Sequence, residues 1–233
     1  MRFVPVSEEI RAQPAFVALR EVWPEFLRHD PISIQHWDRL YSERSEFQFA
    51  LLDENGELLA EANSLPVEGQ PVGWDAAVLN GFAATQPDRL CALAIAIGRN
   101  YQGRRLATAT LEHMRGLAIA HGFRELIAPV RPTLKHLYPL IPTDHYVAWR
   151  REDGSLFDPW LRTHERLGAE LIAVAGESMR IEASVAEWEH WTGMIFPESG
   201  SHIVRGALVP VEIDRERDLG VYVEPNVWMR HSL

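Results

Sequence analysis

The strongest chemical signal in the sequence is a pair of arginines that follows a glycine at the start of a helical segment. Gly103 stands directly before Arg104 and Arg105, and no Ser, Thr, Asp or Asn is placed there as a helix N-cap. Uncapped amide groups, the positive end of a helix dipole and two guanidinium groups together suit an anion such as a pyrophosphate. A plain strand-to-helix turn with solvated arginines explains the same residues, so both interpretations stay open on these grounds.

Other reactive groups give weaker signals. Cys91 is the single cysteine and lies inside an apolar run, so we expect a buried, unreactive thiol and no internal disulfide. The ten histidines include no pair with a ligand spacing such as His-Glu-x-x-His, so no metal site is expected. The Gly-x-Ser-x-Gly motif of serine hydrolases is missing as well.

The elements around the arginines form a strand, a turn, a helix and a second strand. Residues 90–97 are an eight-residue apolar run, whose length predicts a buried strand. Residues 104–121 have helical spacing, and Gly122 predicts the end of that helix. Residues 125–130 predict the next buried strand. A unit of this kind is typical of an α/β fold.

The flanking sequence predicts further elements on both sides. Before the central unit we expect a strand at 3–6, a helix at 14–29 divided by Pro24, a helix at 32–41, and a hairpin of strands 47–52 and 57–64. After it we expect a proline-rich insertion at about 132–155, a helix at 157–167, a strand at 170–175, and tail strands at 203–213 and 219–223.

Composition sets limits on function. With 23 basic and 33 acidic residues the formal net charge is -10, which argues against a nucleic-acid partner. An acidic surface favours a cationic substrate such as an amine, or serves solubility alone. No segment approaches the roughly 18 apolar residues of a membrane span, and the first residues do not resemble a signal peptide. We therefore expect a cytoplasmic protein without a membrane partner.

Residues 97–107 resemble the coenzyme A-binding motif of the GNAT superfamily of CoA-dependent N-acyltransferases. The family pattern is Gln/Arg-x-x-Gly-x-Gly/Ala, between the fourth strand and the third helix. Gln102 takes its first position and Ala107 its last, whereas Arg105 stands where the middle glycine is expected. Residues 160–169 are similar to the family's last motif, Tyr-x-x-x-Gly-Phe, with His164 on the tyrosine and Ala169 on the phenylalanine.

The resemblance covers about residues 3–175 and implies an α/β fold. It predicts one domain over 1–233, with a mixed, mostly antiparallel central sheet and helices on both faces. Residues 176–233 are then a C-terminal extension with an elaborated β-hairpin. The segment 224–231 is rich in specific groups, and it either closes the acceptor site or forms a homodimer contact.

The resemblance also implies a cofactor site for acetyl-CoA or another acyl-CoA as co-substrate. The pantetheine arm would pair with the backbone of Ile95, Ala96 and Ile97. The pyrophosphate would lie on the turn and the first helical residues, namely Gln102, Gly103, Arg104, Arg105, Leu106, Ala107 and Thr108. A small-molecule amine would then attack the thioester directly in a ternary complex.

This reaction needs a base for the amine and a proton for the departing thiolate. His164 could donate that proton as an imidazolium, or it is a helix-surface histidine with no role. Glu61, Asp75 and His145 are conceivable bases. The main alternative is a non-catalytic GNAT-like module that binds CoA or an acyl-carrier arm, and a third is an unrelated α/β protein.

Overall fold

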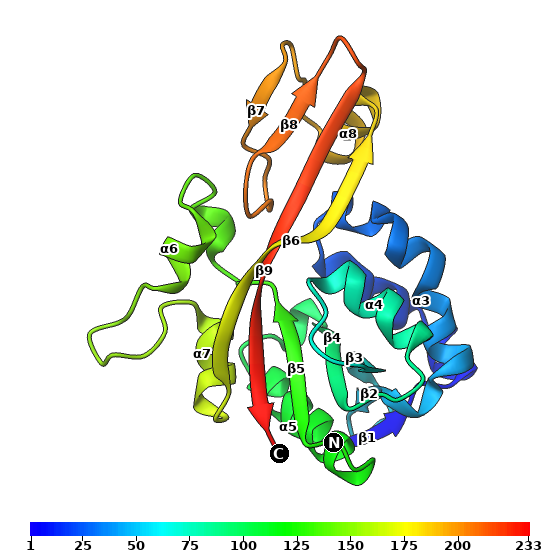
Figure 1. The fold of residues 1–233 in the computed structure, drawn as a ribbon. Coiled ribbons are helices and arrows are strands. Elements are labelled where there is room, and N and C mark those ends of the chain that lie inside the picture. Colours follow the sequence, from blue (N-terminus) through cyan, green and yellow to red (C-terminus); the bar gives the residue numbers. More distant parts are fainter.

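The computed structural model describes residues 1–233 as a nine-stranded sheet with helices on both faces (Figure 1). The strand order is β1-β2-β3-β4-β5-β9-β8-β7, with β6 paired to β9, and only β4 and β5 are parallel. The strands are β1 (Arg2–Pro5), β2 (Gln48–Leu52), β3 (Leu58–Val67), β4 (Arg89–Ile97), β5 (Glu125–Val130), β6 (Glu170–Ala183), β7 (Gly200–His202), β8 (Val211–Asp214) and β9 (Leu219–Ser232). The mixed, mostly antiparallel sheet predicted from the sequence is thus confirmed.

The α-helices alternate with these strands. They are α1 (Glu8–Arg11), α2 (Pro14–Leu19), α3 (Pro31–Glu43), α4 (Trp74–Ala83), α5 (Leu106–Ala120), α6 (Thr143–Val147), α7 (Pro159–Arg166) and α8 (Val185–Thr192). Short 3-10 turns also occur, among them η1 (Arg20–Val22), η2 (Glu25–His29) and η4 (Arg99–Tyr101). None of the helices combines the length and the apolar character that crossing a membrane requires.

Local sequence explains where the helices begin and end. Asp30 caps α3, because its Oδ1 atom accepts the Ser33 amide at 2.6 Å, and Pro31 occupies the first helical position. Gly122 follows α5 with a φ of 80°, as the sequence predicts. Pro24 separates η1 from η2, so the predicted division of segment 14–29 is confirmed.

The central strands are buried on both faces, which explains their uninterrupted apolar runs. Leu90 and Ala92 of β4 belong to the core that α5 and α7 cover. Cys91 and Leu93, the alternate residues, belong to the core formed with α3 and α4 on the opposite face. Figure 1 shows these two pairs of helices on either side of β4 and β5. The strand prediction for residues 90–97 is therefore confirmed.

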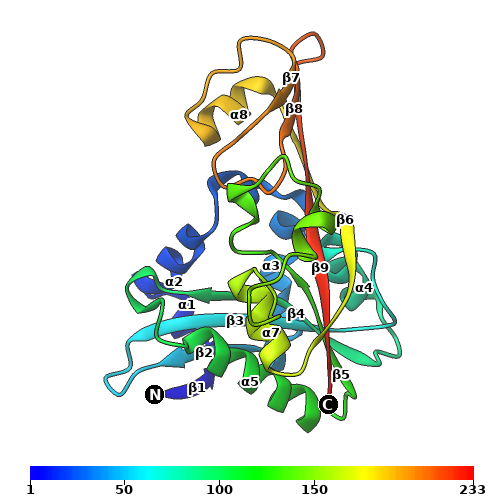
Figure 2. The same ribbon diagram turned by 90° about the vertical axis from the view of Figure 1, so that its left-hand side faces the viewer.

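The C-terminal strand is the largest departure from the sequence-based fold. Residues 176–233 are not an extension outside the core, because the second half of β9 lies between β5 and β6. Val227, for example, pairs with Val130 on one side and Val174 on the other. The first half of β9 continues along β6 and reaches β8 (Figure 2). The expected tail strand at 203–213 is reduced to β8, and β6 runs to Ala183 instead of ending at 175.

Residues 184–218, together with the outer halves of β6 and β9, form a projection that we call the arm. The arm has its own hydrophobic cluster, which includes the fully buried Trp188. Phe26 of η2 packs into this cluster, with its ring centroid 5.1 Å from that of Tyr222. The arm is therefore anchored to the N-terminal helices as well as to the long strands.

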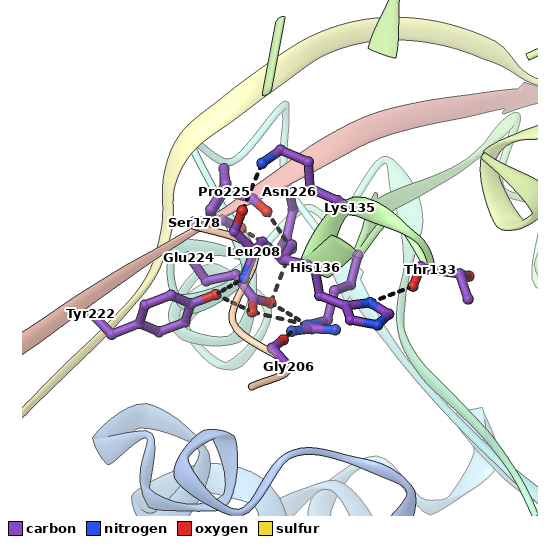
Figure 3. A network of polar contacts seen from close by, with 11 residues as sticks. Thr133, Lys135, His136, Ser178, Gly206, Leu208, Tyr222, Glu224, Pro225 and Asn226 are labelled. Atoms are coloured by element: carbon purple, nitrogen blue, oxygen red, sulfur yellow. Dashed lines mark hydrogen bonds and ion pairs between the residues drawn. The ribbon is translucent and has the colours of Figure 1, made fainter. Parts of the chain in front are cut away.

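A buried ion pair lies where the arm meets the sheet (Figure 3). Glu224 is fully buried next to Pro225, opposite the irregularity in β6. The Arg131 Nε atom donates to both Glu224 oxygens, at 3.0 and 2.9 Å, and the Tyr222 hydroxyl donates to Oε2 at 2.8 Å. Arg131 also donates from Nη2 to the Gly206 carbonyl at 2.5 Å. The pair thus joins the end of β5 to β9 and to the arm.

Replacing Arg131 with methionine is expected to lower the free energy of unfolding by about 3–5 kcal/mol, because it leaves the Glu224 carboxylate buried without its cation. Urea denaturation followed by circular dichroism measures this change. The matched control is Arg180→Met, which breaks the exposed pair with Glu182 and should cost about 1 kcal/mol or less. Equal losses in the two variants would contradict the prediction.

Candidate functional site

The candidate site begins where β4 and β5 separate. The two strands pair only at Leu90 with Leu126 and at Cys91 with Ile127. Beyond these pairs β4 continues against β3, and β5 continues against β9. The edges that face each other across the gap therefore carry backbone groups without a strand partner. Such an edge can hydrogen-bond an extended ligand in place of a strand.

Two local features keep the strands apart. Leu93 is an extra residue in the pairing of β4 with β3, and its carbonyl accepts the indole Nε1–H of Trp74 at 3.0 Å. Pro129 lies in the separated part of β5, paired with Trp228 of β9. A proline has no N–H, so its nitrogen has to point away from the β9 ladder, toward the gap.

The predicted pantetheine-binding residues lie on the free edge of β4. Ile95, Ala96 and Ile97 pair with Ala62, Glu61 and Ala60 of β3, and none of the three pairs with β5. The chain then passes through η4 into the turn before α5. Gln102, in that turn, donates from Nε2 to the Ile97 carbonyl at 3.4 Å. The strand end and the turn are thus continuous, as the proposed CoA site requires.

The turn before α5 has a left-handed conformation at two positions. Gly103 has a φ of 78°, and Arg105 has a φ of 60° and a ψ of 18°. The helix begins at Leu106, two residues later than the sequence predicts, and no side chain caps it. The first amides of α5, in residues such as Ala107 and Thr108, are therefore available to an anion.

Arg105, at the position of the motif's middle glycine, has a left-handed backbone conformation, which glycine adopts readily. The left-handed region costs an L-residue roughly 1–2 kcal/mol, which a glycine avoids. Arginine therefore occupies this position at an energetic cost. The Arg105 side chain is exposed, as is that of Arg104, whose guanidinium lies 5.4 Å from the ring centroid of Tyr101. Both arginines are free to approach a phosphate.

His164 does not lie on the helix surface. It is buried, and its Nδ1 atom lies 3.0 Å from Nε2 of His231, while its own Nε2 atom has no partner. Burial first, and then the neighbouring His231, lower the pKa of His164 to about 3. His231 pairs with Leu126, so the two rings lie near the closed end of the gap. A neutral ring does not favour the imidazolium donor that the sequence predicts.

The three conceivable bases lie in different environments. Glu61 is buried on β3 and accepts hydrogen bonds from Tyr41 and from Asn63 Nδ2, the latter at 3.1 Å. The side chain of His145 is 71% exposed on α6, near Asp144. Asp75 lies in the first turn of α4, directly after the tryptophan that contacts the Leu93 carbonyl. Of the three candidates, Asp75 is therefore the one next to a contact at the gap, the hydrogen bond from Trp74 to the Leu93 carbonyl.

Two contacts fix the start of α4 against β6, and sequence analysis missed both. The Ser178 hydroxyl accepts the Trp74 amide at 2.8 Å and donates to Asn226 Oδ1 at 2.6 Å. A Cβ atom on Gly73 would lie 2.5 Å from the Ser178 Cα atom, so glycine is required for this close approach. The only signal was a Gly-Trp-Asp sequence that follows a Gly/Pro-rich loop.

Cys91 has no exposed surface, so the prediction of a buried cysteine is confirmed, and burial raises the pKa of its thiol. The gap between β4 and β5 and the uncapped turn before α5 can now be set beside a known protein family. The family model described as "Acetyltransferase (GNAT) family" matches residues 16–141. The chain belongs to the GNAT family of acetyltransferases.

Known proteins agree with this assignment to the GNAT family. Arginine N-acetyltransferase avaD of Aspergillus versicolor is 30% identical over 251 residues, covering 92% of this chain and 87% of that protein. The loading GNATL domain of CurA from Lyngbya majuscula superposes with a TM-score of 0.68 at 17% identity, covering 99% of this chain and 96% of that one. The GphF GNAT-like decarboxylase in complex with isobutyryl-CoA has a TM-score of 0.57 at 13% identity, covering 100% and 99%. The family assignment identifies this GNAT chain as an N-acyltransferase.

The left-handed residue of this GNAT motif gives a stability prediction. Arg105→Gly should change the free energy of unfolding by less than about 1 kcal/mol, because glycine relieves the strain but gains freedom in the unfolded chain. Arg105→Val should lower it by about 1–2 kcal/mol, because a β-branched residue fits this region poorly. Chemical denaturation measures both values. Arg104→Val, at a neighbouring exposed position without a positive φ, is the control, and a loss there as large as in Arg105→Val would refute the assignment of strain.

Proposed function

We propose that this GNAT protein transfers an acetyl or another acyl group from acyl-CoA to a small-molecule amine, by direct attack of the amine in a ternary complex. The observation that carries the proposal is the continuity between the free edge of β4 and the uncapped start of α5. An acyl-CoA has an extended amide-containing arm and a pyrophosphate, and these two parts fit the two halves of the site. The bound isobutyryl-CoA of the GphF structure is an example of such a ligand on this fold.

Each half of the site has a separate task. The backbone of Ile95, Ala96 and Ile97 would orient the pantetheine arm and direct the thioester toward the closed end of the gap. The turn and helix start, Gln102 to Thr108, would bind the pyrophosphate through amide groups and through Arg104 and Arg105. Orientation of both reactants is the main contribution we assign to these residues.

A cationic acceptor is supported by two observations. The relative from Aspergillus versicolor is named for arginine, a small molecule with an amine and a guanidinium group. The formal net charge of -10 would raise the local concentration of a cation near the protein. Arginine is therefore the first acceptor to test, followed by other primary amines.

The alternative function is a non-catalytic module that binds CoA or an acyl-carrier arm. It is motivated by Arg105 in place of the motif's glycine and by His164 in place of the family's tyrosine. Arg105 has a left-handed backbone conformation of the kind that a glycine adopts readily. This observation favours an intact CoA site over an altered one. The alternative and the proposed transfer differ in turnover, so one assay separates them.

Full-length protein incubated with acetyl-CoA and L-arginine is expected to release free CoA, which a thiol reagent detects, at a rate that depends on both substrates. Arg104→Glu should raise the Kd for acetyl-CoA about tenfold, equivalent to about 1.4 kcal/mol, because it places a negative charge beside the pyrophosphate. Isothermal calorimetry measures that Kd.

Arg217→Glu makes the same charge change at a side chain 73% exposed on the arm and should leave the Kd for acetyl-CoA unchanged. Binding of acetyl-CoA without CoA release from any amine in a panel would support the non-catalytic module. If no acyl-CoA or free CoA binds at all, the proposed site is wrong.

The role of His164 as donor to the departing thiolate stays a prediction. If it acts in this way, His164→Phe should lower kcat at least tenfold and leave the Kd for acetyl-CoA within about twofold, because only the proton transfer is lost. Steady-state kinetics and calorimetry give the two values. An unchanged kcat would leave His164 with a packing role beside His231.

A further inference from the structure

Two carboxyl groups face each other at the starts of α3 and α4. Asp30 has no exposed surface, and its Oδ1 atom accepts the Ser33 amide at 2.6 Å. Asp75 is half-buried, and its Oδ2 atom accepts the Arg180 amide of β6 at 3.0 Å. The second oxygens, Asp30 Oδ2 and Asp75 Oδ1, are buried and receive no hydrogen bond from a donor group of the chain. The two side chains lie within reach of each other, so each carboxyl group affects the protonation of the other.

No cationic side chain is paired with Asp30 or Asp75, because the arginines of this region are paired with other carboxylates. Glu224 of β9 adds negative charge nearby, and Arg131, the cation of that region, is already paired with Glu224. Arg180 offers its backbone amide to Asp75, while its guanidinium pairs with Glu182. Neither Asp30 nor Asp75 forms a salt bridge. Burial is the main cause that raises the pKa of Asp30 to about 6 and that of Asp75 to about 7. The negative charge of Glu224 adds to both shifts, and that of Asp30 raises the pKa of Asp75 further.

The pair is connected to the gap through Trp74. The Trp74 indole donates to the Leu93 carbonyl, the extra residue of β4, and its amide donates to Ser178 of β6. Asp75 is the next residue on α4, and its carboxyl group accepts the Arg180 amide of β6, so both contacts of Trp74 help to hold its position. The CoA-binding turn belongs to α5, which packs on the opposite face. An acceptor entering on the α4 face would reach the thioester from the side opposite to CoA.

We propose that Asp30 and Asp75 form the subsite for the ammonium group of the acceptor, and that Asp75 takes the proton that this group has to lose before it attacks the thioester. The inference rests on the proposed transfer. An ammonium group has three N–H donors, so it can satisfy both unpaired oxygens. Hydrogen bonds from a charged nitrogen to a carboxylate are also stronger than those between neutral groups.

During the transfer the acceptor nitrogen loses two protons and forms one new bond. The carboxylate of Asp75 takes one proton from R–NH3⁺ and leaves R–NH2, whose lone pair forms the new C–N bond at the thioester carbon. The C–S bond breaks, the CoA thiolate leaves, and the second proton of the attacking nitrogen passes to that thiolate, either directly or through His164. A base with a pKa near the working pH suits the first step, and general-base catalysis typically contributes about 10²–10⁴-fold in rate.

Asp75→Asn is the decisive variant, because it keeps the shape and the hydrogen bonds of the pair. The amide oxygen can accept the Arg180 N–H, and the amide nitrogen can donate to Asp30 Oδ2 without a shared proton. The wild-type kcat/KM for L-arginine should fall as the pH decreases below about 7, because Asp75 becomes protonated. Asp75→Asn should lower kcat/KM at pH 8 about 100-fold, remove this pH dependence, and leave the KM for acetyl-CoA within twofold.

If Asp30 and Asp75 had only a structural role, Asp75→Asn would keep the wild-type kcat/KM, provided that the variant is folded. In the unfolded chain the two carboxyl groups release their protons near their ordinary pKa of 3.8, whereas in the folded protein their pKa values are higher. The pair therefore lowers the stability of the fold as the pH rises toward 7 and above. Asp75→Asn should therefore melt no lower than wild type at pH 8. A variant that is stable yet inactive supports the subsite, whereas one that is stable with wild-type kcat/KM overturns it.

Binding provides a readout that does not depend on turnover. L-arginine titrated into the protein–CoA complex at pH 8 should bind wild type at least tenfold more tightly than Asp75→Asn. Asp88→Asn, at an exposed carboxylate paired with Arg89, is the control and should bind like wild type. Failure of arginine to bind wild type, or equal Kd values in wild type and Asp75→Asn, would overturn the subsite.

The two proposals fail in distinguishable ways. Arginine binding that requires Asp75, without CoA release from any amine, would reject acyl transfer and keep the cation subsite. CoA release that proceeds equally fast in Asp75→Asn would keep acyl transfer and reject the subsite.

Discussion

The early separation of β4 from β5 is the constraint on which the rest of the structure depends. Only two residue pairs hold these parallel strands together. Beyond them, every backbone group on the facing edges needs another partner or a ligand, because unpaired buried amides are costly. β3 supports the outer side of β4, and β9 supports the outer side of β5. The gap is therefore stable because each of its strands has a second neighbour.

The residues that border the gap are shaped by the same constraint. The extra residue Leu93 turns its carbonyl out of the ladder, where Trp74 satisfies it. Pro129 occupies a position where an amide hydrogen has no strand to bind. These contacts also decide where α4 begins, and with it the place of Asp75. Strand separation thus determines the position of side chains far from it in sequence.

The parts of the fold that sequence predicts well are those set by neighbouring residues. The strand–turn–helix–strand unit around Gly103 and the helix end at Gly122 follow from spacing and turn chemistry. The position of β9 in the sheet could not be predicted, because the residue pattern of a strand does not specify which strands pair with it. The pairs Asp30–Asp75 and His164–His231 escaped prediction for a related reason: each joins residues at least 45 positions apart that only tertiary packing brings together.

The site was predictable to the same extent. The turn proposed to bind CoA is local, so a short motif predicts it, and Arg105 has there a left-handed conformation that favours glycine. The proposed acceptor subsite is assembled from the starts of two helices, the β6 irregularity and the middle of β9. No single stretch of sequence carries that pattern. Burial, which reverses the expected charge state of His164, also has no signature in sequence.

The placement of β9 has a consequence for how the chain folds. β5 and β6 are made early, but the strand that joins them follows Val130 by about 100 residues, so their pairing has a high contact order. Until β9 inserts, both strands expose long apolar edges that favour aggregation. Completion of the sheet is therefore a late step, and the proposed acyl-transfer site forms only after the arm has been synthesised.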